Sequence, residues 1–310
     1  MIHGVINVYK EQGYTSHDVV AKLRGILHQK RIGHTGTLDP AAEGVLPVCL
    51  GNATRLVERL TDKTKEYLCT MRLGIVTDTD DLTGTVLSEH RGDLPSEAEI
   101  ESACRSFIGT YAQLPPMYSA IKQDGKKLYE IARARQTVER KTREVTVSEL
   151  QILTPDDVPE TDPASGSVRD VRFRAVVSKG TYIRALCRDI GEKLGCGASM
   201  AALVRTRSGE FLAETALKLD RIEALAGTEE FSEAVLPVEH FYEEYPAFTV
   251  RAENRKQIDN GNPLKYECFL PGADPAALYA RIYDDENRFR ALYRYDKERD
   301  LWMPETVFPV

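Results

Sequence analysis

A glycine-rich loop that carries a carboxylate is the first segment of this sequence that could do chemistry. In residues 33–40, two glycines and His34 precede Asp39 and Pro40. Glycine and proline favour irregular backbone over helix, and a residue before proline is pushed towards extended conformations. A carboxylate on such a loop could act as a nucleophile or as a general acid or base. Taken alone, however, Asp39 could simply close an Asx turn, and His34 could be a hydrogen-bonded loop residue.

The elements around this loop can be predicted from the spacing of apolar residues. Thr15 and Ser16 open a helix whose apolar residues continue to Leu27. Residues 67–73 and 171–177 alternate as strands do, which places Tyr67 on an apolar face, where a core role is the plain alternative. The stripe from Ile183 to Leu194 predicts a second helix, with Gly195 as its C-cap.

The charge distribution indicates a polyanion as a possible partner. The net charge of the 310-residue chain is −7, yet residues 118–147 hold eight basic residues against four acids. The segments 76–101 and 222–250 are strongly acidic. A negative mean can therefore conceal a basic groove that attracts a polyanion. Solvated helix faces are the alternative explanation of the same pattern.

Several classes of protein are disfavoured by the composition. With 42% apolar and 29% charged residues, the chain is an ordinary globular protein of about two domains. It has no apolar run of 18 residues and no export signal, so we expect it in the cytoplasm, without a membrane and with its six cysteines reduced. We expect no cofactor and no metal, because no dinucleotide fingerprint, P-loop or zinc-ligand spacing is present. Asp78, Asp80 and Asp81 could suggest Mg²⁺, but their neighbours favour a loop.

A domain boundary is expected in the acidic stretch near 225–246. We therefore divide the chain into residues 1–240 and residues 246–310. The second part predicts a small β-rich domain, a closed or partly closed barrel, from short strands at Ala280–Tyr283, Phe289–Tyr293 and Leu301–Met303. Residues 155–167 read as a surface insertion.

Residues 33–47 resemble the catalytic-aspartate motif of the TruB family of tRNA pseudouridine synthases. Three further segments agree in order: Lys65–Tyr67, Ser178–Arg184 and Leu203–Gly209. The opening around Lys10 is similar too, although the proline that usually follows this lysine is missing. The resemblance covers about residues 2–215. Residues 246–310 are loosely similar to a PUA domain, an RNA-binding module.

The resemblance implies an α+β fold, with a mixed and mostly antiparallel sheet flanked by helices and a small C-terminal β domain. It also implies an isomerase that breaks the N1–C1′ bond of the uridine at position 55 in the T-arm loop of tRNA and joins C5 to C1′. No atom enters or leaves, so no cofactor is needed. It further implies the bacterial, stand-alone type, which works without guide RNA, and nothing in the sequence suggests more than a monomer.

Roles for individual residues follow from the same resemblance. Asp39 would be the essential carboxylate, and Arg184 would hold the pKa of that group low and fix its rotamer. Tyr67 would stack on the uracil and help to remove its C5 proton. The remaining expected contacts to the substrate come from His34, which would brace the gap left by the extruded base, from Tyr182 and Leu203 around that base, and from Lys10, Lys126 and Lys127.

Two other functions remain possible at this point. A non-catalytic RNA-binding protein or chaperone could use the same groove, although binding alone does not need a carboxylate among phosphates. A catalytic subunit that depends on guide RNA is the second, and the short N-terminus and the lack of long charged tails count against it.

Overall fold

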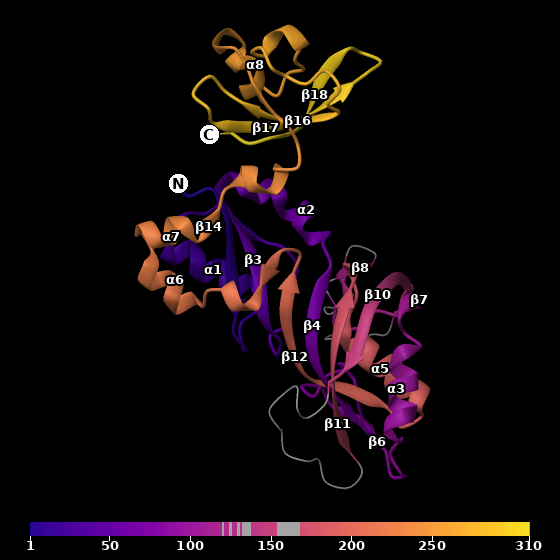
Figure 1. Cartoon of the computed structure of the whole chain (residues 1–310). Helices are drawn as coiled ribbons and strands as arrows, with labels where there is room; N and C mark the ends of the chain where they lie inside the picture. The colour runs from indigo at the N-terminus through magenta and orange to yellow at the C-terminus, as the bar shows by residue number, and fades with distance from the viewer. Residues whose placement is uncertain (120, 124–125, 129–130, 132–137, 154–167, 310) are drawn as a thin grey trace.

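One large mixed sheet is the central element of the structure. The computed structural model describes residues 1–119, 121–123, 126–128, 131, 138–153 and 168–309. The main path of the sheet has the order β14-β1-β3-β12-β4-β11-β10-β7, and β2 and β13 are attached beside it. The pairings are antiparallel except that of β12 with β3. The expected α+β fold with a mostly antiparallel sheet is confirmed (Figure 1).

The strands of the large sheet are long in its centre and short at its margins. In chain order they are β1 (Gly4–Lys10), β2 (Ile32–His34), β3 (Glu43–Leu50), β4 (Lys65–Leu73), β7 (Gly109–Gln113), β10 (Arg143–Ile152), β11 (Arg169–Val177), β12 (Ala198–Ser208), β13 (Phe211–Leu212) and β14 (Val235–Leu236). Two hairpins stand apart from it: β5 (Ile75–Thr77) with β6 (Val86–Glu89), and β8 (Lys122–Gln123) with β9 (Lys126–Lys127).

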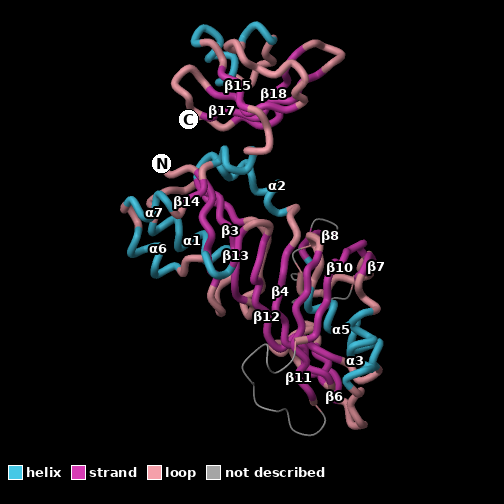
Figure 2. The backbone as a smooth tube through the Cα atoms, in the orientation of Figure 1, coloured by secondary structure: helices cyan, strands magenta, loops and turns pink. Residues whose placement is uncertain are grey.

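The helices cover the sheet in two separate groups (Figure 2). Helices α1 (Ser16–Ile26), α6 (Leu219–Leu225) and α7 (Glu229–Glu233) pack on β1 and β3 and close one apolar core. Helices α3 (Glu97–Arg105) and α5 (Ile183–Leu194) pack on β4, β10 and β11 and close a second core. A short 3-10 helix, η1 (Gly51–Leu56), runs into α2 (Val57–Thr61). The irregular loop that carries Asp39 lies between these two cores.

The helix ends that flank the loop are fixed by local chemistry. The hydroxyl of Thr15 accepts a hydrogen bond from the backbone of Asp18, and the Asp18 carboxylate accepts one from the backbone of Thr15. This reciprocal capping box satisfies two otherwise unpaired donors at the start of α1. Helix α5 ends at Gly195 in the left-handed conformation, with φ of 74°, which glycine adopts without steric cost. Both predicted helices are confirmed within two residues of their expected ends.

The C-terminal residues form a small sheet with its own apolar core. The sheet is an open path of β15 (Ala247–Thr249), β16 (Tyr279–Tyr283), β17 (Phe289–Asp296) and β18 (Leu301–Val307), with two isolated bridges beside it. Helix α8 (Arg255–Asp259) and the short turns η5 (Ala252–Asn254) and η6 (Tyr266–Cys268) complete it. Its buried side chains include Phe248 and Trp302. The expected small C-terminal β domain is confirmed.

A third core joins this C-terminal sheet to the rest of the chain. The turns η3 (Ala213–Thr215) and η4 (Val238–Tyr242) precede the C-terminal sheet in the chain. Phe241 and Tyr242 of η4 pack with Leu292 and Phe308. The Tyr242 ring lies 5.9 Å from that of Phe289 and 6.0 Å from that of Phe308. The C-terminal sheet therefore packs on the rest of the chain through buried aromatic side chains.

Two sequence predictions differ from the structure or fall outside it. The irregular segment begins later than expected, because Gly33 and His34 belong to β2 and pair with β3. The whole of the predicted insertion at 155–167 lies outside the described residues, as do parts of the basic segment 118–147. In the part of the chain that the structure describes, no helix is long and apolar enough to cross a membrane.

Candidate active site

The loop that carries Asp39 is held against the start of α1. The backbone N–H of Leu38 donates to the Ser16 hydroxyl at 2.9 Å, and the same hydroxyl donates back to the Leu38 carbonyl at 3.3 Å. The N–H of Gly13 donates to the carbonyl of Pro40 at 2.8 Å. The residues on both sides of Asp39 are thus held by backbone hydrogen bonds, so its carboxylate projects from a fixed point rather than from a free loop.

The Asp39 carboxylate is paired with Arg184 on the first turn of α5. Arg184 Nε lies 2.8 Å from Asp39 Oδ2, although the two residues are 145 positions apart in the chain. The two outer nitrogens of the guanidinium donate hydrogen bonds to backbone carbonyls: Nη1 to that of Thr79 at 3.0 Å and Nη2 to that of Tyr118 at 2.9 Å. The Arg184 side chain is 5% exposed. All three nitrogens of the guanidinium therefore have partners, which fixes its plane.

A second carboxylate, Asp81, completes this charged group. Its Oδ2 lies 3.8 Å from Arg184 Nη1. Its Oδ1 accepts hydrogen bonds from the hydroxyl of Thr79 at 2.8 Å and from the backbone of Thr83 at 3.0 Å. Two acids thus share one arginine. Sequence reasoning considered Asp81 only as a loop residue or a metal ligand, because nothing in its own segment indicates Arg184 as a partner.

The pKa of Asp39 departs from the direction expected from sequence. Burial raises the pKa of this carboxyl group above its ordinary value, and Asp81 raises it further. The guanidinium of Arg184 lowers the pKa but does not cancel these effects. The predicted lowering effect of Arg184 is confirmed, but the expectation of a low pKa for Asp39 is wrong, because burial outweighs the arginine. That expectation considered the arginine without the loss of solvent that pairing with a buried arginine requires.

An apolar wall lies beside the ion pair. Tyr67, which is 8% exposed on β4, and Leu203, which is 7% exposed on β12, belong to the same buried cluster. Leu38 and Ile183 also belong to it, and these are the sequence neighbours of Asp39 and Arg184. The charged pair consequently sits at the rim of the cluster that holds Tyr67. The structure thus brings Asp39 and Arg184 together, and the apolar neighbours of both share a buried cluster with Tyr67. The place of Tyr67 at the same site stays a prediction.

Tyr182 and His34 are partly buried, Tyr182 at the N-cap of α5 and His34 at the end of β2. The backbone of Tyr182 exchanges two hydrogen bonds with the side chain of Gln113, at 2.8 and 3.1 Å. Burial raises the pKa of the Tyr182 hydroxyl. Burial lowers the pKa of His34, so its ring is neutral at pH 7. The ring of His34 lies 5.4 Å from that of His17, edge to face, and its buried Nδ1 has no hydrogen-bond partner.

Lys10 takes a structural position rather than the expected place in contact with substrate. Its side chain is fully buried. The ammonium donates to the carbonyls of Tyr14 at 2.6 Å, Glu11 at 3.2 Å and Pro40 at 3.4 Å. Burial lowers the pKa of Lys10 to about 8. A buried ammonium with three acceptors has no donor left for a phosphate, so we assign it to holding the Asp39 loop.

The other predicted contacts lie in the basic segment. Lys126 and Lys127 form β9, which pairs with β8, and their side chains lie outside what the structure describes.

Two of the acids that could suggest a magnesium site are engaged in contacts within the protein. Asp80 pairs with Arg188 at 2.9 Å, and Asp78 accepts a hydrogen bond from the backbone of Thr85 at 2.7 Å. Among the described residues, no group of three histidine, cysteine or carboxylate side chains is placed to hold a metal ion.

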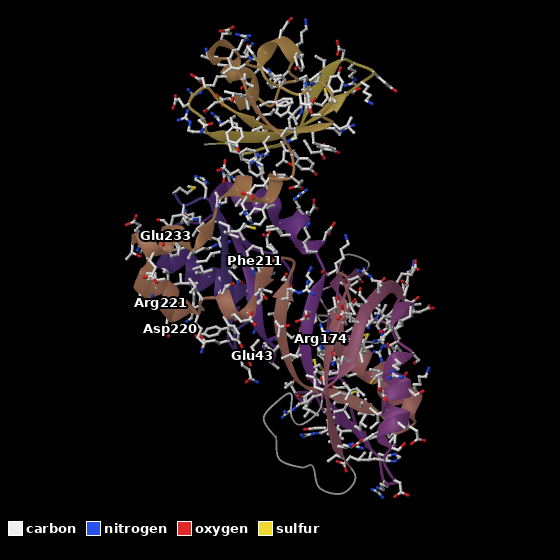
Figure 3. All side chains as sticks on the ribbon, viewed as in Figure 1. Glu43, Arg174, Phe211, Asp220, Arg221 and Glu233 are labelled. Carbon is white, nitrogen blue, oxygen red and sulfur yellow. The ribbon has the colours of Figure 1, made fainter. Side chains whose placement is uncertain are left out.

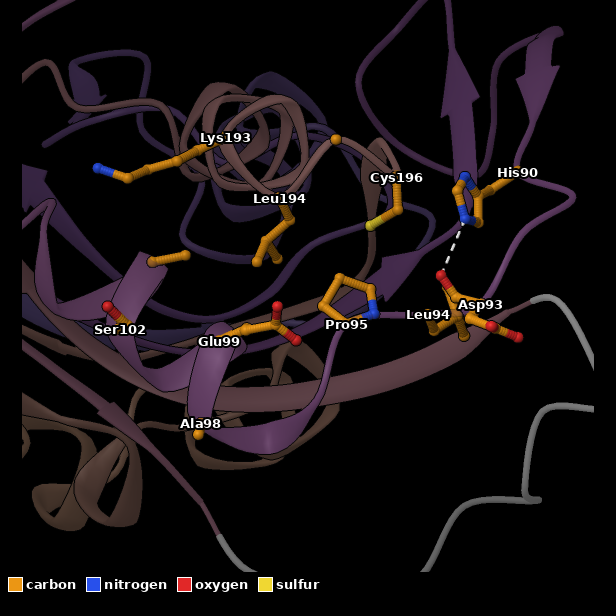
Figure 4. Close-up of a pocket in the computed structure, with 12 residues that line it drawn as sticks. His90, Asp93, Leu94, Pro95, Ala98, Glu99, Ser102, Lys193, Leu194 and Cys196 are labelled. Carbon is orange, nitrogen blue, oxygen red and sulfur yellow. Dashed lines mark hydrogen bonds between the residues drawn. The ribbon is translucent and has the colours of Figure 1, made fainter.

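A separate pocket lies at the far end of α5 (Figure 4). It has a volume of about 670 Å³ and lies between the segment His90–Ala103 and the residues Lys193–Cys196. His90 closes one side through a 3.1 Å contact from its Nε2 to the carbonyl of Asp93. Lys193 is nine residues after Arg184, which is roughly 13 Å along a helix axis. This pocket is therefore distinct from the site around Asp39.

Comparison with known proteins identifies the family of this arrangement. Residues 24–183 match the N-terminal domain of the TruB family pseudouridylate synthases, and residues 184–242 match the tRNA pseudouridylate synthase B C-terminal domain. The chain belongs to the TruB family. The motif resemblance seen in the sequence is thereby confirmed over most of the large sheet.

Relatives of similar length support the same assignment. The chain is 47% identical to the tRNA pseudouridine synthase B of Lachnoclostridium phytofermentans, over 99% of this chain and 100% of that protein. It is 39% identical to that of Bacillus pumilus, over 99% and 98%. Among solved structures, a Cbf5-Nop10-Gar1 complex is similar with a TM-score of 0.68 and 32% identity, over 99% of this chain and 85% of that one. An H/ACA RNP bound to a substrate RNA containing 2′-deoxyuridine is similar with a TM-score of 0.66 and 29% identity, over 99% and 86%.

Proposed function

We propose that this TruB family chain isomerises the uridine at position 55 in the T-arm loop of tRNA to pseudouridine, with Asp39 as the essential carboxylate. Full-length relatives named tRNA pseudouridine synthase B support the reaction and the substrate class. The observation that carries the assignment of Asp39 is its 2.8 Å ion pair with Arg184 at the rim of the cluster that contains Tyr67. We also propose that the chain acts in the cytoplasm, on the basis of this substrate class.

The chemistry of the reaction matches the groups that meet at the site. The N1–C1′ bond of uridine breaks, the uracil turns, C5 bonds to C1′, and the proton on C5 moves to N1. This rearrangement needs an ionised carboxylate near the sugar and a flat apolar surface for the detached base. Asp39 supplies the first and Tyr67, with Leu203, supplies the second. The hydroxyl of Tyr67 is our proposed participant in the removal of the C5 proton.

Access to the sugar requires the nucleotide to leave its stack. Extrusion of a base costs a few kcal/mol, which stacking and backbone contacts must offset. Tyr182 is our proposed second contact to the extruded base. His34 is neutral and has an unpartnered Nδ1, which suits a side chain that braces the vacated space and accepts or donates one hydrogen bond.

The rest of the tRNA is proposed to bind through two flanking parts. Lysines in the basic segment 118–147, including Lys126 and Lys127, would contact phosphates of the T arm. Residues 246–310 would act as a PUA-like RNA-binding module beside the catalytic residues 1–240. We propose that the chain acts as a monomer, without guide RNA and without a cofactor.

Incubation of the full chain with an unmodified tRNA transcript tests this proposal. Pseudouridine is mapped by carbodiimide treatment and primer extension, and we expect one stop, at position 55. A transcript with cytidine at that position is the matched control and should give no stop. Binding of the transcript without any stop would support a binding protein instead, and stops elsewhere would contradict the proposed target.

A further inference from the structure

Arg205 is a buried cation beside the active site to which no role has yet been given. It lies on β12, two residues after Leu203, and is 1% exposed. In the sheet it stands in register with Tyr67 on β4 and with Gly44 on β3. It therefore sits between the strand that carries the proposed base-stacking tyrosine and the strand that follows the Asp39 loop.

The guanidinium of Arg205 joins Gly36 of that loop to Val45 of β3. Its Nε donates to the carbonyl of Val45 at 2.6 Å, and its Nη2 donates to the carbonyl of Gly36 at 3.3 Å. These carbonyls lie on either side of Asp39 in the chain. Both acceptors are neutral, whereas Arg184 has a carboxylate, that of Asp39, as its partner. Burying a guanidinium against neutral carbonyls is expensive in free energy, so its presence calls for a reason beyond packing.

Two glycines shape the space around Arg205. Gly44 has φ of +107°, and a Cβ built on it would come within 2.2 Å of the Arg205 carbonyl oxygen. Gly36 has φ of +96°, and a Cβ there would lie 3.7 Å from Arg205 Nη1. The absent side chain at Gly44 is what permits β3 and β12 to approach so closely. Gly44 thus serves the approach of the two backbones, and the contacts specific to the arginine side chain are those to the carbonyls of Val45 and Gly36.

We propose that Arg205 is a positioning residue that sets the place of Asp39 relative to Tyr67. The loop has other anchors, Ser16 to Leu38 and Lys10 to Pro40, but these tie it to α1 and to the end of β1. Arg205 instead ties it to β12, the neighbour of β4. Displacement of a catalytic group by about 1 Å can cost roughly 100-fold in rate, so this link bears directly on the reaction.

The test is Arg205→Lys, with Arg72→Lys as the control. Lysine keeps the charge, but one ammonium cannot span the carbonyls of Val45 and Gly36 in the planar geometry of a guanidinium. Arg72 lies in the same sheet and pairs with Asp170 at 2.7 Å, outside the site. We expect Arg205→Lys to lower the single-turnover rate about 10- to 100-fold, with the tRNA Kd within twofold of the parent. Arg72→Lys should leave the rate and the Kd within twofold of the parent.

The inference rests on the proposed function, and the outcomes keep the two apart. Absence of pseudouridine formation by the parent chain contradicts the proposed function itself. An active parent with an Arg205→Lys rate within twofold, measured well below both Tm values, overturns the role of Arg205. If the lysine variant does not fold, Arg205→Gln removes the buried charge, keeps one donor group and is judged by the same criteria. Added guanidinium at millimolar concentration should raise the rate of Arg205→Ala, and no rise overturns the proposal.

Discussion

At the scale of single residues, the site combines a carboxylate with partial removal of solvent. In its ionised form, a carboxylate with a raised pKa is a stronger base and nucleophile than an ordinary aspartate. Burial supplies this effect for Asp39, and Arg184 keeps the ionised form accessible by pairing with it at 2.8 Å. The arginine is itself fixed by two carbonyls, so it cannot follow the carboxylate away from its place.

Asp39→Asn should abolish pseudouridine formation and leave tRNA affinity nearly unchanged. The amide keeps the shape of the side chain but cannot act as nucleophile or base, so we expect a loss of at least about 10³-fold in single-turnover rate. Asp170→Asn on β11 is the matched control, because Asp170 pairs with Arg72 at 2.7 Å outside the site. A rate for Asp39→Asn within tenfold of the parent would end the catalytic assignment.

The raised pKa of Asp39 predicts where activity is lost in acid. Protonation removes the reactive form, and a raised pKa means that protonation begins at a higher pH than for an ordinary aspartate. The single-turnover rate should therefore fall on a limb that lies above the ordinary pKa of 3.8. Asp81→Asn removes a negative neighbour, which lowers the pKa of Asp39 and should move this limb to lower pH.

The control for that shift is Asp78→Asn in the same loop. Asp78 accepts a hydrogen bond from the backbone of Thr85. Its substitution should leave the acid limb in place. Rate profiles of the three chains between pH 4 and pH 8 provide the measurement, and an Asp81→Asn limb that stays put or moves upward would contradict the electrostatic account.

At the scale of elements, the sequence was most informative where one periodicity persists. The apolar stripes at 16–27 and 183–194 predicted α1 and α5, and the alternation at 67–73 predicted most of β4. The motif resemblance then placed Asp39, Tyr67 and Arg184 together. Three-dimensional partners were not predictable in this way. Lys10 looks like any exposed basic residue in sequence, yet it is surrounded by two carbonyls from the turn that follows it and by a third from Pro40.

The charged back face of the sheet illustrates the same limit. Arg174, labelled in Figure 3, pairs with Glu66 at 2.9 Å and with Glu149 at 2.6 Å, which joins β11 to the strands on either side. Nothing local to Arg174 indicates these partners, because they follow from strand register. Salt bridges of this exposure contribute little to stability, so they leave only a weak pattern in a sequence.

The basic segment is the element whose role in binding is most open to experiment. Charge reversal of Lys126 and Lys127 to glutamate should weaken tRNA binding at least about tenfold and reduce its salt dependence, because fewer counterions are released. The rate at saturating protein should hold. Filter binding over a range of salt concentrations measures the first effect.

A control with the same change in net charge is Arg105→Glu with Arg221→Glu, two exposed residues on α3 and α6. Affinity should then change far less than in the lysine variant. A fall in the saturated rate with unchanged affinity would show that β8 and β9 serve the reaction rather than binding.

At the scale of the whole molecule, the C-terminal sheet is both a separate unit and part of a shared core. Its own core holds Phe248 and Trp302, whereas Tyr242 of the preceding turn is 3% exposed and packs against Phe289 and Phe308. Such an aromatic interface sets the spacing between the proposed RNA-binding module and Asp39. A tRNA that contacts both would meet them at one fixed separation, so the second contact adds affinity without a large loss of entropy.

Removal of residues 246–310 should therefore separate chemistry from affinity at a cost in stability. Every proposed catalytic residue precedes position 210, so the truncated chain should still modify a T-arm stem-loop at close to the parent rate. Its affinity for whole tRNA should fall, because the module's contacts are lost. Its Tm should fall too, since each large apolar side chain uncovered at the interface costs roughly 1.5–3 kcal/mol. Assays well below that Tm, with truncated Asp39→Asn as the inactive control, decide the matter: a folded truncated chain that is inactive on the stem-loop would mean that the C-terminal sheet takes part in catalysis.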